Sequence, residues 1–435
     1  MLGKFLTQSK WSKILVPITG IISMLLINIS VTSLIIPAVL PISKVRVVSD
    51  SAGHRLQVNG EDYMIFGMNW DYFPIGTNYT YNLWDKSDAF IEEALQREMT
   101  LLKSMGVNTI RQYSDIPPRW VTHIFENYSI FTIINHPFAR YGVELEGEWI
   151  ANVDYSDPNL RHFILTDVAE MVAEFKDTPG VLMWLLGNEN NYGLFWKSTE
   201  TGNIPDGEPL EQIRARQLYS LLNETIETIH DLDDNRPVAI ANGDLLFLDI
   251  IAEEIDNLDI FGANVYRGAS FGDLFDVVHQ KLDVPVMFTE FGADAFNVKE
   301  MREDEVTQAK YLLANWQEIY EQASGNGKVG NAIGGFTFQF SDGWWKYQQT
   351  TNLNIHDTNA SWSNGGYLED LVQGKNNMNE EWFGICEKGV SDDHGFYKLT
   401  PRAAYYALQK VHSLNPLSPT INLDQIQYHF SNIKP

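Results

Sequence analysis

Residues 180–193, with the sequence GVLMWLLGNENNYG, decide the fold that we predict for this chain. Residues 181–186 form a continuous apolar run, which is short enough for a strand buried on both faces, as in a parallel sheet. The run ends abruptly at Gly187, Asn188 and Glu189. Glu189 is therefore expected just beyond the C-terminal end of a strand, where α/β sheets and barrels expose their chemistry.

A second stretch, residues 284–292 (VPVMFTEFG), is built in the same way, because its apolar strand ends in Glu290. In a closed barrel of parallel strands, Glu189 and Glu290 would lie at the same end and face each other across the mouth. Two carboxyl groups about 5 Å apart suit a retaining double displacement at a glycosidic bond. Either glutamate alone could equally be a helix-cap neighbour or an ion-pair partner, so the pair carries the hypothesis.

Strand-like apolar runs alternate with helical periodicity along the chain, which is the pattern of a parallel sheet covered by helices. Eight such units predict an α/β fold of the (β/α)8 TIM barrel type. The alternative is a doubly wound open sheet, but residues 66–71 after the first strand are not its glycine-rich phosphate loop. The expected strands are 63–66, 108–113, 131–134, 181–186, 238–241, 258–263, 284–290 and 332–338, and the expected helices are 88–104, 118–126, 160–176, 210–230, 246–254, 271–282, 303–322 and 401–414.

The segments on either side of the barrel are short. Residues 44–67 read as two alternating strands around a turn, a β-hairpin that we expect to close one end of the barrel. Thr400 is expected to cap the last helix, with Pro401 in its first position. No linker of biased composition and no internal repeat occurs, so we predict one domain over 44–415 and a C-terminal tail over 416–435.

The amino terminus predicts a membrane anchor. Residues 14–43 contain no charged side chain, and that length can cross a hydrocarbon core of about 30 Å. Lys4, Lys10 and Lys13 precede this segment, so the positive-inside rule makes 1–13 a cytoplasmic tail and places the barrel outside, in the periplasm or the extracellular space. A cleaved signal peptide is the alternative, but no clear cleavage site is present.

The composition argues against several other classes of protein. The chain has 31 Lys and Arg against 57 Asp and Glu, a net charge of −26, and no basic patch, which argues against a nucleic-acid partner. Cys386 is the single cysteine, so no intrachain disulfide can form. The sequence contains no His-x-His or His-Glu-x-x-His pattern, and we expect neither a catalytic metal nor an organic cofactor.

The motifs LLGNENNYG around Glu189 and FTEFGA around Glu290 resemble the catalytic motifs of the retaining glycoside hydrolases of clan A. The resemblance is greatest to the TIM-barrel catalytic domain of glycoside hydrolase family 2, with families 72 and 5 as alternatives. In family 5 a proline usually follows the acid/base glutamate, whereas Asn190 follows it here. Residues 97–115 also resemble the second βα unit of the clan, and 397–411 resemble its closing helix.

This resemblance assigns roles to individual residues. It makes Glu189 the general acid/base, Glu290 the nucleophile, and Asn188 a partner of the sugar 2-hydroxyl. It makes Arg111 and Tyr266 the groups that orient Glu290 and keep it ionised. Glu189, in contrast, must be protonated near neutral pH to act as an acid.

Other candidates for substrate contacts follow from their places at strand ends and in long loops. Trp70 follows the first strand and His136 the third, although a packed histidine is an equal alternative for His136. Trp344 or Trp345, after the eighth strand, would form the floor of the sugar site. The loops 191–209 and 341–399 are long and aromatic, which predicts a groove for several sugar units, with local packing of the rings as the alternative: Phe195, Trp196, Trp344, Trp345, Tyr347, Trp362, Tyr367, Trp382 and Phe383.

Family 2 enzymes typically carry β-domains before the barrel, and here a membrane anchor is expected in their place. We therefore predict a retaining β-glycoside hydrolase or transglycosylase for a β-glucan or related extracytoplasmic polysaccharide, with family 72 as the precedent for transfer. The alternative is a non-catalytic barrel that binds polysaccharide beside a synthase in a membrane synthesis or export complex. A metal-dependent hydrolase is a further alternative, which the missing histidine patterns disfavour.

Overall fold

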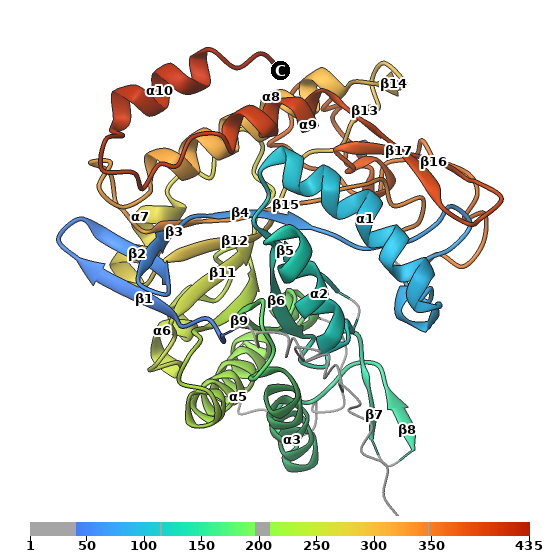
Figure 1. The fold of residues 1–435 in the computed structure, drawn as a ribbon. Helices are drawn as coiled ribbons and strands as arrows, with labels where there is room; N and C mark the ends of the chain where they lie inside the picture. Colours follow the sequence, from blue (N-terminus) through green and yellow to red (C-terminus); the bar gives the residue numbers. More distant parts are fainter. Residues whose placement is uncertain (1–40, 114, 146, 196–208, 347) are drawn as a thin grey trace, which may run out of the picture. The chain divides into compact units, whose positions relative to one another are not determined.

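The computed structural model describes residues 41–113, 115–145, 147–195, 209–346 and 348–435 (Figure 1). The expected cytoplasmic tail and nearly all of the expected anchor at 14–43 lie outside these residues, as do Trp196 and Tyr347. Among the helices in the described ranges, none combines the length and the apolar character that crossing a membrane requires.

The centre of the fold is a closed barrel of eight parallel strands, as predicted. Each strand is hydrogen-bonded to the next in chain order, and the last strand returns to the first. The barrel strands are β4 (Ile65–Asn69), β5 (Thr109–Arg111), β6 (Phe131–His136), β9 (Val181–Leu186), β10 (Val238–Gly243), β11 (Ile260–Asn264), β12 (Val286–Phe291) and β15 (Ala332–Thr337).

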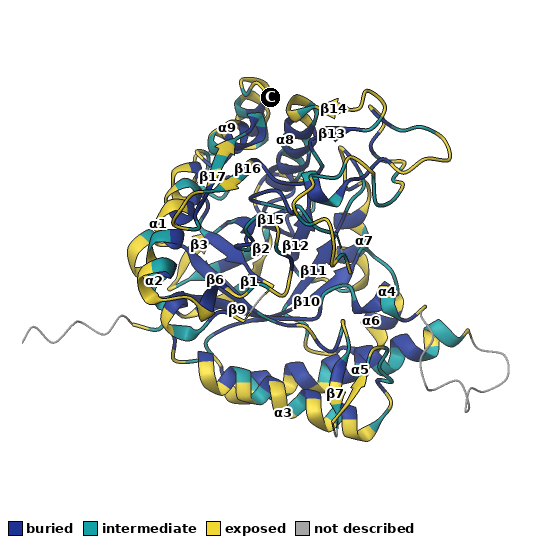
Figure 2. Ribbon diagram, turned by 90° about the vertical axis from the view of Figure 1, so that its right-hand side faces the viewer, coloured by how far each residue is buried: buried dark blue, intermediate teal, exposed yellow. Residues whose placement is uncertain are grey.

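Amphipathic helices follow the strands and cover the barrel, with their buried faces inward and their exposed faces outward (Figure 2). In α3, for example, Leu160, Ile164, Val168 and Val172 recur every fourth residue, and all four are buried. The principal helices are α1 (Asp88–Met105), α2 (Pro118–Tyr128), α3 (Pro158–Phe175), α5 (Leu210–Leu232), α6 (Leu248–Glu254), α7 (Leu274–Lys281), α8 (Glu305–Glu321) and α9 (Ala403–Val411).

The end of the barrel where the strands begin is closed by the predicted N-terminal hairpin, which a third short strand extends. This sheet consists of β1 (Val45–Asp50), β2 (Gly53–Val58) and β3 (Glu61–Tyr63). Val45 and Leu56 are fully buried, in one apolar cluster with barrel residues such as Leu182 and Met287. The hairpin therefore completes the apolar interior at this end, as the sequence predicted.

The predicted cap of the last helix was wrong. Thr400 and Pro401 belong to strand β17 (Tyr397–Pro401), which pairs with β16 (Cys386–Ser391). This pairing holds both residues in an extended conformation, so α9 begins after Arg402. The backbone N–H of Arg402 donates to the Ile385 carbonyl at 3.0 Å and fixes the start of the helix.

The structure also contains elements that the sequence did not indicate. The expected tail at 416–435 includes helix α10, whose Phe430 packs against Tyr320 with ring centroids 5.2 Å apart. Asn422 and Gln425 form a capping box at its start. The remaining short elements are η1 (Leu83–Asp85), β7 (Val143–Leu145), β8 (Glu148–Ile150), α4 (Asn190–Gly193), β13 (Phe296–Asn297), β14 (Arg302–Glu303), η2 (Glu380–Trp382) and α10 (Leu423–Ser431).

Candidate active site

Polar side chains gather inside the barrel at the C-terminal ends of its strands. Asn69 ends β4, Arg111 ends β5, Asn264 ends β11, and Glu290 is the penultimate residue of β12. All four are buried, although the interior at the other end of the barrel is apolar. Buried polar groups must be hydrogen-bonded to one another, so this region is expected to form one connected network.

A bulge in β12 directs Glu290 into this network. Ala263 of β11 pairs with Phe288, but the next residue, Asn264, pairs with Glu290, so Thr289 is an extra residue on β12. The Thr289 carbonyl accepts hydrogen bonds from Arg111 Nη1 at 3.0 Å and from Asn69 Nδ2 at 3.2 Å. The bulge is thus held by donors from β4 and β5, which follow β15 around the barrel from β12.

The carboxylate of Glu290 accepts hydrogen bonds from three side chains. Arg111 Nη1 donates to Oε1 at 3.0 Å, and the Tyr113 hydroxyl donates a short hydrogen bond to the same oxygen. The Tyr266 hydroxyl donates to Oε2 at 3.0 Å. Three donors that converge on one carboxylate fix its orientation. The expected contacts of Arg111 and Tyr266 with Glu290 are present, and their roles in catalysis stay predictions.

Arg111 is itself held in place by amides. Its side chain is fully buried, and Asn135 Oδ1 accepts from both Nε and Nη2, at 3.2 and 3.0 Å. Nη2 also donates to Asn188 Oδ1 at 2.8 Å. Because Asn188 immediately precedes Glu189, this guanidinium physically connects the two predicted catalytic motifs.

The turn that carries Glu189 depends on Asn190. Gly187 has φ +83°, and a Cβ at this position would lie 2.7 Å from Asn190 Oδ1, so only glycine fits. Asn190 Oδ1 accepts from the Asn188 N–H at 2.8 Å, and its Nδ2 donates to the Phe138 carbonyl and the Tyr155 hydroxyl, both at 2.8 Å. Asn190 is therefore the structural centre of the turn.

Glu189 has the electrostatic setting of a general acid. Burial raises the pKa of its carboxyl to about 7, and the negative charge of Glu290 contributes to this rise. The Asn264 amide and the charges of Arg140 and Arg111 act in the opposite direction. The two carboxyl groups are thus close enough to influence each other, and the raised pKa favours the protonated form that a general acid needs.

Asn188 belongs to the same network, and its predicted contact with the sugar 2-hydroxyl stays a prediction. Its Oδ1 accepts from Arg111 and, at 3.1 Å, from Asn264 Nδ2, while its Nδ2 donates to the Tyr141 hydroxyl at 2.8 Å. The Thr289 hydroxyl donates to Asn264 Oδ1 at 2.6 Å. These contacts leave the Asn188 amide one orientation, with its Nδ2 toward Tyr141.

Two predicted substrate contacts lie elsewhere. Trp70 is 1% exposed and donates its indole N–H to Glu98 of α1 at 2.6 Å, so it packs between the barrel and that helix. His136 is also buried, and both of its ring nitrogens have partners, Asp167 of α3 at 2.9 Å and the Phe138 N–H at 3.1 Å. Neither ring contacts Glu189 or Glu290, because each is turned outward by a partner on a helix or loop.

The two candidate tryptophans after β15 are both partly exposed. Trp344 stacks on His356 with ring centroids 4.6 Å apart, and His356 stacks on Trp382 at 3.7 Å. Trp345 instead packs its ring edge to face against Phe73, at 5.8 Å. Trp344 thus has the more rigid support for a sugar-binding ring. Which of the two forms the floor stays a prediction.

Sequence reasoning missed several members of the network. Tyr113 was expected only as the end of a strand, and Asn69, Asn135 and Asn264 were not singled out. All four stand at or just after a barrel strand, where the interior changes from apolar to polar. A polar residue that interrupts the apolar pattern at a strand end was the signal that could have found them.

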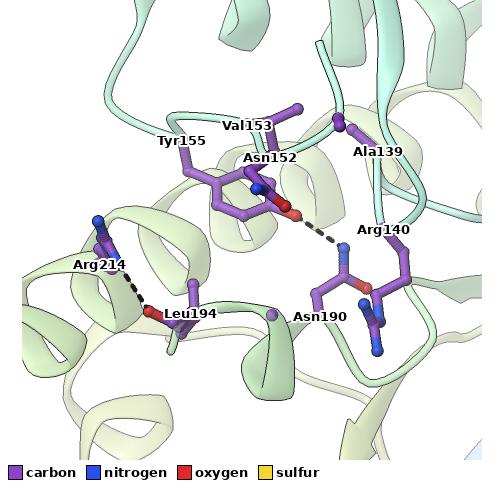
Figure 3. A pocket seen from close by; sticks show the side chains of 10 residues that line it. Ala139, Arg140, Asn152, Val153, Tyr155, Asn190, Leu194 and Arg214 are labelled. Atoms are coloured by element: carbon purple, nitrogen blue, oxygen red, sulfur yellow. Dashed lines mark hydrogen bonds between the residues drawn. The ribbon is translucent and has the colours of Figure 1, made fainter. Parts of the chain in front are cut away.

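A small cavity lies beside the Glu189 turn (Figure 3). Asn190 and Tyr155 face each other across it, joined by their hydrogen bond, and Arg214 reaches it from α5. Arg140 also lines it and donates from Nε to the Asn188 carbonyl at 3.0 Å. Glu189 and Glu290 are not among its lining residues, so this cavity is separate from the pair of carboxyl groups.

No cluster of metal ligands adjoins the two glutamates among the described residues. The one group of three His, Cys, Asp or Glu side chains found there with metal-like spacing is His54, His279 and Asp283. It lies where β12 begins, at the opposite end of the barrel.

Comparison with known sequences identifies relatives of the barrel. The family described as glycosyl hydrolases family 2, TIM barrel domain, matches residues 82–352. The beta-galactosidase of Photobacterium profundum is 25% identical over 141 residues, which are 32% of this chain and 12% of that protein. A 1,3-beta-glucanosyltransferase of Aspergillus fumigatus is 24% identical over 294 residues, 64% of this chain and 54% of that protein.

Solved structures share the fold. The beta-glucuronidase of Bacteroides uniformis superimposes with a TM-score of 0.55 at 15% identity, covering 85% of this chain and 37% of that one. The GH2 beta-galacturonidase of Eisenbergiella tayi gives a TM-score of 0.52 at 16% identity, with 86% and 54% covered. The chain thus spans about one eighth of the beta-galactosidase and between a third and a little over half of these structures.

Proposed function

Because the chain belongs to the family of glycosyl hydrolases family 2 TIM barrel domains, we propose that it is a retaining β-glycosidase or transglycosylase. One observation carries this proposal. Three donors hold the Glu290 carboxylate, whereas the pKa of Glu189 is raised to about 7. One carboxylate held by three donors and a neighbouring carboxyl group with a raised pKa suit the nucleophile and the general acid/base of a retaining mechanism.

In the first step, Glu290 attacks the anomeric carbon while the bond to the leaving oxygen breaks and Glu189 donates its proton to that oxygen. A covalent glycosyl ester on Glu290 results. In the second step, Glu189 removes a proton from water or from a sugar hydroxyl, whose oxygen attacks the anomeric carbon and releases Glu290. Two inversions give net retention, and the identity of the acceptor decides between hydrolysis and transfer.

We further propose that the substrate is a β-glucan or a related polysaccharide outside the cytoplasm. The match to the 1,3-beta-glucanosyltransferase extends over twice as much of this chain as the match to the beta-galactosidase. The stack of Trp344, His356 and Trp382 offers aromatic surface on which the apolar face of a pyranose can pack. The apolar segment at 14–43 would anchor the enzyme with its barrel on the outer side of the membrane, where a polysaccharide synthase could supply its substrate.

The test is to incubate the purified chain with a panel of β-linked glucans and oligosaccharides and to analyse the products. Shorter products indicate hydrolysis and longer products indicate transfer. Proton NMR of the first products should detect the β-anomer before mutarotation, whereas an initial α-anomer would exclude retention. Saturable binding of a polysaccharide without any product would instead favour a non-catalytic binding barrel.

A further inference from the structure

The closed end of the barrel carries a cluster that the proposed catalysis does not use. His54 of β2, His279 in the last turn of α7 and Asp283 in the loop before β12 bring one ligand atom each within 4.8 Å of one another. His54 Nε2 lies 3.3 Å from Asp283 Oδ1, and His279 Nδ1 lies 2.9 Å from the same oxygen. We propose that these three side chains bind a divalent transition metal of the zinc type.

The donor set selects this class of metal. Two imidazole nitrogens and one carboxylate suit Zn²⁺, Co²⁺, Ni²⁺ or Cu²⁺, whereas Ca²⁺ and Mg²⁺ prefer oxygen ligands throughout. Tetrahedral Zn²⁺ has bonds of about 2.0–2.1 Å to nitrogen and oxygen, so its ligand atoms lie roughly 3.3 Å apart. The two separations, 3.3 and 2.9 Å, are equal to this value and slightly below it, and a water molecule would complete the coordination.

A hydrogen bond to Ser49 prepares His54 for this role. Its side chain is 10% exposed, and its Nδ1 lies 2.7 Å from the Ser49 hydroxyl. A serine hydroxyl can accept as well as donate, so Nδ1–H can bond to Ser49 while Nε2 presents its lone pair to the metal. Metal binding would then require a change of tautomer at both His54 and His279, because the ring nitrogen that each directs at Asp283 now donates a hydrogen bond to it. His279 and Asp283 have side chains 52% and 71% exposed, which gives an ion access from solvent.

The position of the cluster suggests what the metal does. His54 belongs to the hairpin that closes the barrel. His279 is in the last turn of α7, and Asp283 is in the connection from α7 to β12. A bound ion would fasten the hairpin to this connection. It would also place positive charge beyond the C-terminal end of α7, which the helix dipole favours. Glu290 is near the other end of β12, so we expect the metal to stabilise the fold without altering catalysis.

The experiment is isothermal titration of the full chain, without any polyhistidine tag and freed of metal by a chelator, with Zn²⁺ alone. We expect saturable binding of one ion per chain and a rise in melting temperature of about 2 °C or more at saturating Zn²⁺. Co²⁺ in the same site should give the visible absorption of a tetrahedral complex.

Two variants keep the test falsifiable. Asp283 has φ +51°, a conformation that asparagine tolerates, so Asp283→Asn removes the carboxylate without straining the backbone. His279→Gln removes an exposed ligand in the same way, and His394→Gln, at an exposed histidine between β16 and β17, is the matched control. Both site variants should weaken Zn²⁺ binding at least tenfold, and the control should bind as the wild type does. No saturable binding by the wild type, or equal binding by all variants, would mean that the cluster is only hydrogen-bonded.

Discussion

The two catalytic candidates are the same residue type in contrasting settings. Glu290 belongs to a barrel strand, and its carboxylate accepts from a fully buried arginine and two tyrosines. Glu189 lies after β9 as the N-cap residue of the short helix α4, with a left-handed backbone, φ +56°, and burial beside Glu290 raises its pKa to about 7. Local environment, not residue type, therefore separates a nucleophile that must stay charged from an acid that must be able to hold a proton.

The largest expected effect comes from Glu290→Gln. Glutamine preserves the shape of the side chain and can still accept from Arg111, but it cannot form the glycosyl ester. We expect turnover of any active substrate to fall by roughly 10⁴-fold or more. Initial rates with the best substrate of the glucan panel measure this effect.

The control for Glu290→Gln is its melting temperature, which should stay near that of the wild type because the amide oxygen replaces one carboxylate oxygen in the network. A folded Glu290→Gln variant with undiminished turnover would contradict the assignment of the nucleophile.

Glu189→Ala should have the next largest effect, about 10²- to 10⁴-fold on substrates whose leaving group needs protonation. The loss should be much smaller with an activated aryl leaving group, because such a group departs without an acid. Azide can enter the space left by the side chain and attack the glycosyl ester, since no general base is needed for an anionic nucleophile. The product to detect is a β-glycosyl azide; an α-azide would exclude the double displacement.

Much of the fold was predictable because barrel strands leave a strong signal in sequence. The apolar runs at 181–186 and 332–338 are continuous because both faces of each strand are buried. Strand ends and caps were less predictable. The pairing of Cys386 with Pro401 in the hairpin of β16 and β17 extends the strand through Pro401, and this pairing overrode the local signal for a helix start.

The residues of the site also fall into those that the sequence predicted and those that it did not. Glu189, Glu290, Arg111 and Tyr266 were found because each follows an apolar strand or matches a motif. Tyr113 escaped because its role depends on the path of the chain after β5, where its hydroxyl meets Glu290. For His136 the sequence left two alternatives, a substrate contact and a packed histidine, and the structure has the packed one. A histidine at a strand end can turn toward the mouth or toward the covering helix, and Asp167 on α3 determines the second direction.

Removing one tyrosine hydroxyl should have a smaller effect than removing either glutamate. Tyr266→Phe leaves Glu290 Oε2 without its donor, whereas Tyr113→Phe leaves Oε1 still bonded to Arg111. We therefore expect roughly a 10- to 100-fold loss of kcat for Tyr266→Phe and a smaller loss for Tyr113→Phe. Kinetics of both variants on one substrate give the ranking, and the reverse order would show that Oε1 is the attacking oxygen.

The pH dependence of the wild type should report the acid. Glu189 must be protonated in the first step, so kcat/KM should decline as the pH rises through about 7, by about tenfold per unit well above that value. Substrates with activated leaving groups do not need the acid and should lack this alkaline decline. A profile that stays flat to high pH for a natural glucan would assign the proton to another group.

The smallest expected effect is a change in the pKa of Glu189. It measures directly how strongly the charge of Glu290 acts on that residue. The negative charge of Glu290 raises the pKa of Glu189, so the neutral side chain of the Glu290→Gln variant should lower it. Carboxyl ¹³C NMR titration can follow this pKa, with Glu189→Gln as the variant that identifies the resonance. Burial remains the larger cause of the rise, so the pKa should stay above the ordinary value for glutamate even in the variant. An unchanged pKa would mean that the two carboxyl groups do not interact. The proposal that both act on one glycosidic bond would then lose its electrostatic support.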